Sequence, residues 1–364
     1  MIKIPIAKPL IENDDIYIAN KALKSGWISS KGPYVKKFER KFEKFLGGGY
    51  AVSVSNGTTA LELGIKSLGI KPGDEIIVPN FTFAASINAV INCGVTPVLA
   101  DVEDENWTIK LSEIKKKITK KTKAIMLVHI YGQPCYIDEI KKFSNQKKIL
   151  IIEDCAEALG SRYKKKTVGL DGDCSCHSFF ANKSITTGEG GMVVFKKKKI
   201  FEKALLIKNH GMSNKRKYFH EVVGSNYRLT NIQAAIGYSQ LKKIKKIINI
   251  RKKIFDNYNK LLSDDYFYKI PSNNWSTNSY WLYYVIVKKK INRDKLIIKL
   301  LENGIEVSPT FYPLHLMNIY KDFGNGSFKN SEKIGFKGIC LPSSGISFMQ
   351  QKYIVNKIMN LINL

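Results

Sequence analysis

Lys183 and Asp154 are the ionisable residues of this sequence whose surroundings suggest chemistry, because each follows an apolar run. Lys183 comes soon after the run 177–180, so we expect it at the end of a buried strand. Partial burial lowers the pKa of a lysine, and the free amine can then form a Schiff base with a carbonyl compound. The chain is rich in lysine, however, and most lysines are solvated. Position alone therefore leaves both interpretations of Lys183 open.

Asp154 follows the apolar run 149–152 in the segment EDCAE (residues 153–157). A carboxylate at the end of a buried strand is costly unless it has a cationic or hydrogen-bonding partner. The sequence therefore predicts such a partner for Asp154, with the capping of a following helix as the alternative.

A third feature is the junction between a short strand, 51–55, and a helix that opens at Asn56-Gly57-Thr58-Thr59. Free N–H groups and the helix dipole make such a junction suitable for binding an anion, such as a phosphate. Simple capping by Asn56 or Thr58 would explain the same residues.

The segment around Lys183 predicts two short strands, 176–180 and 192–195, joined by a turn. We expect Gly188, Gly190 and Gly191 to supply the unusual backbone angles of this turn. The preceding run Cys174-Ser175-Cys176-His177 resembles a set of metal ligands. No second cluster completes a four-ligand site, and the alternation is typical of a strand, so we predict no metal site.

Apolar strands also recur at 75–79, 97–100, 124–130 and 149–152, with helical sequence between them. This alternation predicts an α/β fold with a mostly parallel sheet of about seven strands, covered on both faces. A long amphipathic helix, about 232–258, leads to a smaller α+β unit. Its strands are expected at 281–287 and 305–308, and its helices at 293–303 and 350–361. We therefore predict a large domain, 1–245, and a small C-terminal domain, 246–364.

Composition and charge limit the classes of protein to which this chain can belong. The chain has 364 residues, of which 44% are hydrophobic. It has neither an apolar run of about 20 residues, as a membrane span needs, nor a signal peptide, so we expect a cytoplasmic protein without a membrane partner. The net charge of +28 would attract polyanions. No nucleic-acid-binding signature is present, and a phosphorylated small substrate is the better interpretation.

With a strand-end lysine, a strand-end acid and a Gly-Thr-Thr helix start, the sequence resembles fold type I pyridoxal-phosphate aminotransferases. Within this class it resembles the DegT/DnrJ/EryC1/StrS family of nucleotide-sugar aminotransferases, over essentially the whole chain. The subgroup that it resembles most is that of the GDP-perosamine synthases. The matching segments are EDCAEALGS (153–161), SFFANKSITTGEGGM (178–192), HGMS (210–213), VVGSNYRLTNIQAAIG (222–237) and FYPLH (311–315). Ala181 departs from the glycine that is frequent in this subgroup. Lys183 stands where the dehydratase branch has histidine, which favours transamination over deoxygenation.

The resemblance implies pyridoxal 5'-phosphate as the cofactor. Lys183 would be bonded to it and would move the proton during the reaction, and Asp154 would pair with the pyridine nitrogen. Glu157 would approach the ring hydroxyl, and Phe83 would stack on the ring. The residues expected at the cofactor phosphate are Gly57, Thr58, Ser178 and, from the neighbouring subunit, Asn226. The residues expected around the sugar nucleotide are Trp27, Ser29, Arg228 and His315.

The implied reaction moves an amino group from L-glutamate to the 4-keto group of a nucleotide-linked 4-keto-6-deoxyhexose. In the subgroup that the chain resembles, this converts GDP-4-keto-6-deoxymannose into GDP-perosamine, and the active enzyme is a homodimer with shared sites. The alternatives are a UDP- or dTDP-linked 4-keto sugar, or an 8-keto octulosonate. A protein of another class, a regulatory or binding protein that keeps this fold without catalysis, is the remote alternative.

Overall fold

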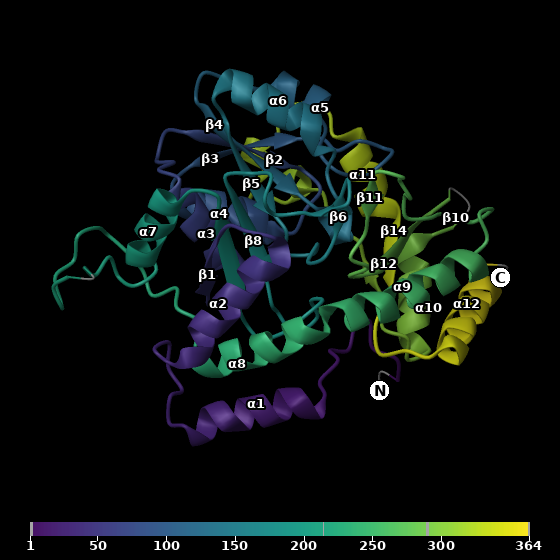
Figure 1. The fold of residues 1–364 in the computed structure, drawn as a ribbon. Helices are drawn as coiled ribbons and strands as arrows, with labels where there is room; N and C mark the ends of the chain where they lie inside the picture. The colour runs from purple at the N-terminus through teal and green to yellow at the C-terminus, as the bar shows by residue number, and fades with distance from the viewer. Residues whose placement is uncertain (1–2, 214, 289–290, 363–364) are drawn as a thin grey trace.

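The computed structural model describes residues 3–213, 215–288 and 291–362. A seven-stranded sheet forms the centre of the larger unit (Figure 1). Its strands are β1 (Tyr50–Val54), β2 (Glu75–Pro79), β3 (Thr96–Ala100), β4 (Thr122–Val128), β5 (Leu150–Asp154), β8 (Cys174–Ser178) and β9 (Gly191–Phe195). They lie in the order β1-β9-β8-β5-β4-β2-β3. Only β9 runs antiparallel to the other strands of this sheet, so the predicted mostly parallel sheet is confirmed.

Both faces of this sheet are covered by helices, as expected for strands that are apolar on both sides. On one face lie α3 (Gly57–Ser67), α4 (Ala84–Asn92) and α7 (Lys198–Ile207), and on the other α2 (Pro33–Leu46), α5 (Leu111–Lys117) and α6 (Ile137–Lys147). Consecutive residues of β2 illustrate the alternation, because Ile76 and Ile77 belong to different core clusters.

Helix α2 shows how local sequence sets these elements. Pro33 occupies its first turn, where a missing N–H costs nothing. Buried Phe38 and Phe42 lie one turn apart on its inner face. Gly47 ends the helix with a φ of 94°, a conformation that suits glycine. On the outer side of α2 lie α8 (Asn231–Gln240) and then α1 (Asn13–Lys24).

The single helix predicted over 232–258 is wrong, because the chain breaks between two helices. After α8, a short 3-10 turn (Leu241–Lys243) leads into α9 (Ile244–Leu261). Gln240 and Lys243, on either side of this break, both donate to the buried carboxylate of Asp15 on α1. The break thus coincides with a tertiary contact to α1. The periodicity of residues 232–258 alone cannot reveal such a contact.

The smaller unit is a four-stranded antiparallel sheet with helices packed on it. Its strands are β10 (Phe267–Tyr268), β12 (Tyr283–Val287), β14 (Gly338–Leu341) and β13 (Ser308–Pro309). Its helices are α10 (Arg293–Glu302), α11 (Lys329–Lys337) and α12 (Phe348–Ile362), together with α9. The strand expected at 305–308 begins only at Ser308. We propose that the two units meet at 245/246, as the sequence predicts.

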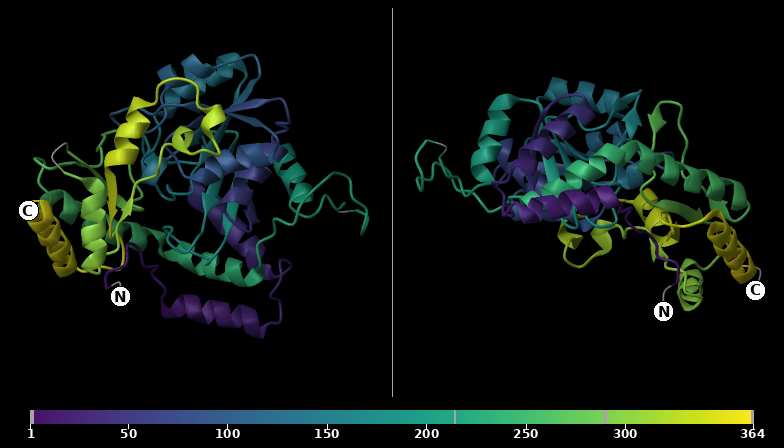
Figure 2. Two further views of the ribbon diagram at one scale, coloured as in Figure 1. Left: turned by 180° about the vertical axis from the view of Figure 1, so that it is seen from behind. Right: turned by 60° about the horizontal axis from the view of Figure 1, so that its bottom comes forward.

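A third sheet of β6 (Arg162–Tyr163), β7 (Lys166–Thr167) and β11 (Ser276–Thr277) was not predicted, since strands of two residues leave no periodic signal. Its strand β11 lies in the chain between β10 and β12 of the small sheet, whereas β6 and β7 follow β5 of the large sheet, so the third sheet joins the two units. Both chain ends lie beside the smaller unit (Figure 2), where Ile4 pairs with Ile305. Across the described ranges, no helix combines the length and the apolar character needed to cross a bilayer.

Candidate active site

The residues predicted to do chemistry gather at the edge of the large sheet where its parallel strands end. Asp154 is the last residue of β5, Ser178 is the last residue of β8, and Asn56 follows β1. The registers of β1, β9 and β8 align Val54 and Ser178 on either side of Gly191. In open α/β sheets this edge is where ligands bind.

The predicted phosphate site is formed by the start of α3 and the end of β8. A Cβ atom added to Gly57 would lie 2.9 Å from the Cβ atom of Ser178, so only glycine allows this approach. Asn56 caps the helix by accepting the N–H of Thr59 at 2.9 Å. The N–H groups of Gly57 and Thr58, in the first turn of α3, have no earlier carbonyl of the helix to bind. They remain suited to an anion, so capping and anion binding coexist here.

Lys183 lies in a loop beyond β8 and not at a strand end as predicted. Strand β8 ends two residues earlier than expected, and Phe180, predicted within it, is 44% exposed. The N–H of Lys183 donates to the carbonyl oxygen of Phe180 at 3.0 Å, which closes a turn. The Lys183 side chain is nevertheless only 13% exposed. Burial lowers the pKa of its amine, against the opposing charges of Glu157 and Asp154.

The glycines of this loop have a different role from the one predicted. Only Gly188 has a left-handed conformation, with a φ of 81°. Gly190 and Gly191 are instead required by close packing: added Cβ atoms would lie 2.1 Å from Thr187 Oγ1 and 2.3 Å from the carbonyl oxygen of Asn56, respectively.

Asp154 has the hydrogen-bonding partners that the sequence required. The Ser86 hydroxyl donates to Asp154 Oδ2 at 2.8 Å, and the N–H of Ala156 donates to Asp154 Oδ1 at 3.1 Å. Burial raises the pKa of this carboxyl above its ordinary value. A cation placed against it would restore the ionised form.

Glu157 connects Lys183 to the backbone of the turn that follows β4. Its Oε1 lies 3.7 Å from Lys183 Nζ, and its Oε2 accepts the N–H of Tyr131 at 2.6 Å. Tyr131 has a left-handed backbone, with a φ of 48°, which is rare for a residue with a bulky side chain. Such strain persists where the surroundings enforce it, often at functional sites. Burial raises the pKa of Glu157 to about 7.

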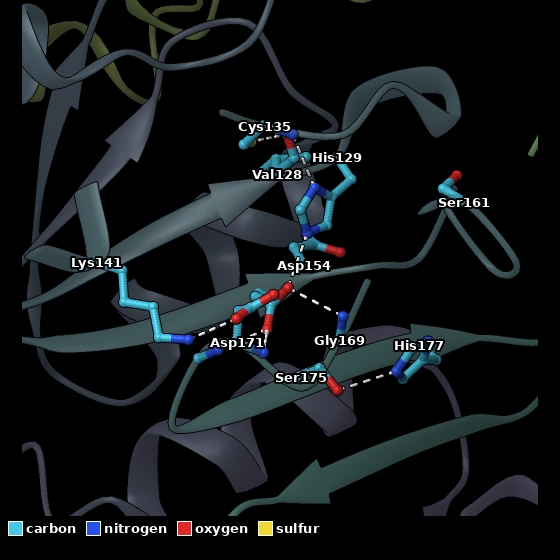
Figure 3. A network of polar contacts seen from close by, with 12 residues as sticks. Val128, His129, Cys135, Lys141, Asp154, Ser161, Gly169, Asp171, Ser175 and His177 are labelled. Carbon is cyan, nitrogen blue, oxygen red and sulfur yellow. Dashed lines mark hydrogen bonds and ion pairs between the residues drawn. The ribbon is translucent and has the colours of Figure 1, made fainter. Parts of the chain in front are cut away.

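A buried polar network lies next to Asp154 (Figure 3). His129 Nδ1 accepts the N–H of Cys135 at 3.1 Å, so Nε2 carries the hydrogen and donates to Glu153 Oε2 at 3.1 Å. Glu153 also accepts three backbone N–H groups, from residues 169, 171 and 172. His129, Glu153 and Cys155 place potential metal-ligand atoms within 4.8 Å of one another. The histidine nitrogens and carboxylate oxygens are paired within the protein, so the network fixes the ends of β4 and β5.

The Cys174–His177 run forms β8, as its alternation predicted. Added to Gly64 of α3, a Cβ atom would lie 3.1 Å from Cys174 Sγ and 3.4 Å from Cys176 Sγ. Ser175 and His177 are hydrogen bonded to each other at 3.1 Å. Alternate side chains of a strand point to opposite faces of the sheet, so the thiols and the imidazole lie on opposite sides.

The other predicted residues lie around this centre, and most are accessible. Phe83 precedes α4 and is 57% exposed, with its ring 5.6 Å from that of Phe311. His315 Nδ1 lies 2.9 Å from Asn80 Nδ2, and Asn80 follows β2. Arg228 donates to Asn209 Oδ1 at 2.5 Å.

Three predicted residues lie in exposed loops. Asn226 forms an isolated bridge with Asn209, next to the segment after α7 that projects from the body (Figures 1 and 2). The carbonyls of Trp27 and Ser29 accept hydrogen bonds from Asn231, which ties their loop to the start of α8. Within the described ranges, no hydrogen bond or ion pair joins these loops to Lys183.

Sequence reasoning missed Trp281 and Arg251, which enclose Lys183. The Trp281 ring centroid lies 3.7 Å from Lys183 Nζ. Arg251 is buried on α9 and donates to the carbonyl oxygen of Lys183 at 3.1 Å. Trp281 was assigned only to a strand, and Arg251 stands among lysines on an amphipathic helix. Neither carries a local signal of its role.

This fold and site define a pyridoxal-phosphate-dependent aminotransferase of fold type I. The chain belongs to the DegT/DnrJ/EryC1/StrS aminotransferase family, whose model matches residues 9–359. It is 42% identical to a GDP-perosamine synthase from Vibrio cholerae over 364 residues, 99% of each chain.

Solved structures support the same assignment. An aminotransferase of Helicobacter pylori involved in pseudoaminic acid biosynthesis has a TM-score of 0.94 and 27% identity, covering 99% of both chains. An Escherichia coli GDP-4-keto-6-deoxy-D-mannose-3-dehydratase with bound hydrated PLP has a TM-score of 0.90 and 26% identity, covering 98% of this chain and 100% of that one.

The residues present fit pyridoxal phosphate. The Gly57–Ser178 approach leaves the N–H groups at the start of α3 for a phosphate. Each oxygen of the buried Asp154 carboxylate accepts one hydrogen bond and has a lone pair left for a ring N–H. The Lys183 amine is buried beside Glu157, and Phe83 presents an exposed ring. Gly57, Thr58, Ser178, Asp154, Glu157, Lys183 and Phe83 would therefore hold the cofactor.

Glu157→Gln should remove a pH-dependent loss of stability from the cofactor-free protein. Because the pKa of Glu157 is raised from 4.5 to about 7, the folded chain holds a proton there that the unfolded chain releases. The free energy of unfolding should therefore fall as pH rises from 4.5 through 7, by about 2 kcal/mol from this group. Urea unfolding at pH 5 and 7.5 measures the fall. The fall should be smaller by this amount in Glu157→Gln, because Asp154 and other groups still titrate, and it should be unchanged in the control Glu202→Gln, whose side chain is exposed on α7. Equal falls in both variants would contradict the assignment.

Proposed function

We propose that this chain transfers an amino group from L-glutamate to the 4-keto group of a nucleotide-linked 4-keto-6-deoxyhexose. The substrate that we propose is GDP-4-keto-6-deoxymannose, and the product is GDP-perosamine. The observation that carries the proposal is the buried Lys183 amine, 3.7 Å from Glu157 and beside the carboxylate-bearing end of β5. We further propose a cytoplasmic homodimer that acts on this sugar and on neither nucleic acid nor membranes.

Support for the sugar comes from two relatives. The Vibrio cholerae protein that is 42% identical along the whole chain is a GDP-perosamine synthase. The Escherichia coli dehydratase of the same fold is named for GDP-4-keto-6-deoxy-D-mannose. The chain also has Lys183 where the dehydratase branch is expected to have histidine, which favours amination of the keto carbon.

Different residues of the chain have different roles in the proposed amino transfer. When bound, pyridoxal phosphate supplies the electron sink for the transfer. Asp154 holds a positive charge at the ring nitrogen, and the N–H groups of Gly57 and Thr58 bind the phosphate. Lys183 Nζ carries the proton to and from the substrate carbon. Burial suits this step, because a lowered pKa increases the fraction of the amine that is unprotonated and able to accept a proton.

A panel of purified nucleotide 4-keto sugars tests the substrate. The protein is incubated with L-glutamate and a GDP-, UDP- or dTDP-linked 4-keto-6-deoxyhexose, or with an 8-keto octulosonate, and the amino sugar is detected by mass. We expect product with the GDP-linked sugar at a kcat/KM at least about tenfold above the others, a difference of ~1.4 kcal/mol. Preferential amination of another member of the panel would overturn the GDP assignment. No amination of any sugar would favour a non-catalytic protein.

The shared site of a homodimer is a separate proposal that rests on Asn226. This residue is exposed and pairs with Asn209, just after α7, next to the segment that projects from the body (Figure 1). If Asn226 donates to the cofactor phosphate of a partner, neither subunit has a complete site alone.

Mixing inactive Lys183→Ala chains with inactive Asn226→Asp chains should therefore restore activity. Each mixed dimer has one intact site, formed by Lys183 of one chain and Asn226 of the other. With random exchange, activity should approach about one quarter of wild type, since half of the dimers are mixed and half of their sites are intact. Activity after exchange of differently tagged subunits measures the recovery. Complete exchange without recovery would show that Asn226 acts within its own chain.

A further inference from the structure

Trp281 places an aromatic face against the amine of Lys183. The residue precedes β12 of the smaller unit and is 4% exposed. Its ring centroid lies 3.7 Å from Lys183 Nζ, well within the roughly 6 Å at which a cation interacts with a ring face. Glu157 also contacts the amine, with its Oε1 3.7 Å from Lys183 Nζ. The free amine therefore has a defined position between an indole and a carboxylate.

Three hydrogen bonds hold the indole and the lysine loop together. Trp281 Nε1 donates to the carbonyl oxygen of Asn182 at 2.9 Å. Arg251 Nη1 donates to the carbonyl oxygen of Trp281 at 2.9 Å, and its Nη2 donates to that of Lys183 at 3.1 Å. A single buried guanidinium thus bridges the two backbones that meet at the amine. Because these bonds are accepted by backbone carbonyl groups, they hold the indole and the lysine loop in place whatever the state of the Lys183 side chain.

The charges around the amine act in opposite directions. Burial and the nearby Arg251 lower the pKa of Lys183, whereas Glu157 and Asp154 raise it. The electron-rich face of Trp281 stabilises the ammonium form, so it works with the carboxylates. Removal of the ring alone should therefore shift the balance toward the neutral amine.

We propose that Trp281 is a positioning residue, which holds the Lys183 amine beside Glu157 whenever that amine is free, and that Arg251 locks this arrangement. The inference rests on the proposed role of Lys183 as the reacting amine. It also gives the smaller unit a part in the reaction. Trp281 comes from the segment that leads into β12 and Arg251 comes from α9, so the amine is held only when these segments are docked on the lysine loop.

The test follows the reactivity of Lys183 in the cofactor-free protein. A small amine-reactive reagent is applied from pH 6 to 11, and labelling of the Lys183 peptide is measured by mass spectrometry. In Trp281→Leu, the midpoint of the profile should move to lower pH, with labelling near pH 8 about tenfold faster. Trp281→Phe retains a ring face, so its midpoint should stay near wild type. The matched control Trp275→Leu, near Tyr136 and Tyr163 and without contact to Lys183, should leave it unchanged.

The pH dependence of labelling distinguishes a loss of positioning of the Lys183 amine from a general increase in its access to the reagent. A looser structure would raise labelling at every pH without moving the midpoint, which would overturn the proposal. If the Trp281→Leu chain does not fold, a second measurement tests the same contact without that substitution. Tryptophan emission of the wild-type protein should change with pH as the Lys183 amine titrates, and Lys183→Met should lack that step. An identical step in Lys183→Met would contradict the contact. Neither readout uses the sugar, so failure here is distinct from failure of the substrate panel.

Discussion

Lys183→Ala should lower turnover by at least about 10³-fold, ~4 kcal/mol in barrier, while the protein still binds the amine form of the cofactor. The lysine amine is needed both for the covalent link to the cofactor and for proton transfer at the substrate carbon. The other contacts, from Gly57, Thr58, Ser178 and Asp154, hold phosphate and ring without it. Steady-state amination measures the first effect, and equilibrium titration with pyridoxamine phosphate measures the second.

A matched lysine controls for the loss of a buried cation. Lys208 is 14% exposed and lies 3.3 Å from Glu39, which resembles the burial and pairing of Lys183. Lys208→Ala should keep turnover within a few-fold of wild type, because this pair lies outside the proposed site. If Lys183→Ala retained turnover within about tenfold, a loss of only ~1.4 kcal/mol, the assignment of Lys183 would be wrong.

The large sheet could be predicted from the sequence because its strands are apolar on both faces and alternate with helices. Each of the seven strands was placed to within about two residues, the usual uncertainty of an element end. The largest consequence of such an error is at β8. There a shift of two residues moved Lys183 from a strand end into a loop, whose hydrogen bonds to Phe180 and Gly190 no periodicity encodes.

The chemical residues were recognisable mainly from the motifs that the chain shares with a known family. Position alone left each of them an ordinary explanation, which was solvation for Lys183 and helix capping for Asp154, and the contact that requires Gly57 is visible only in the structure. Trp281 and Arg251 could not be found in this way. They reach Lys183 from segments about 100 and 70 residues away, so only tertiary structure brings them to the amine. The same holds for Ser86, whose hydroxyl looks ordinary until it is seen to donate to Asp154.

Asp154→Asn should slow the chemical steps by about 10²–10³-fold, the scale found when one preorganised electrostatic partner is removed. The amide oxygen can still accept a hydrogen bond, so Ser86 or Ala156 keeps a partner and the end of β5 should stay in place. A neutral amide cannot favour a proton on the ring nitrogen, and the electron sink of the cofactor is weakened. Cofactor affinity should change by less than about tenfold, since the phosphate contacts remain intact.

Stopped-flow measurement of the half-reaction with L-glutamate separates these two effects, because it follows the chemical step apart from product release. Asp173→Asn is the matched control. Its carboxylate also accepts a backbone N–H of β5, that of Ile151 at 2.9 Å, but at the opposite end of the strand. We expect a normal half-reaction in that variant. An unchanged half-reaction rate in Asp154→Asn would mean that this buried acid only caps the end of its strand, and that the ring nitrogen needs no charged partner in this protein.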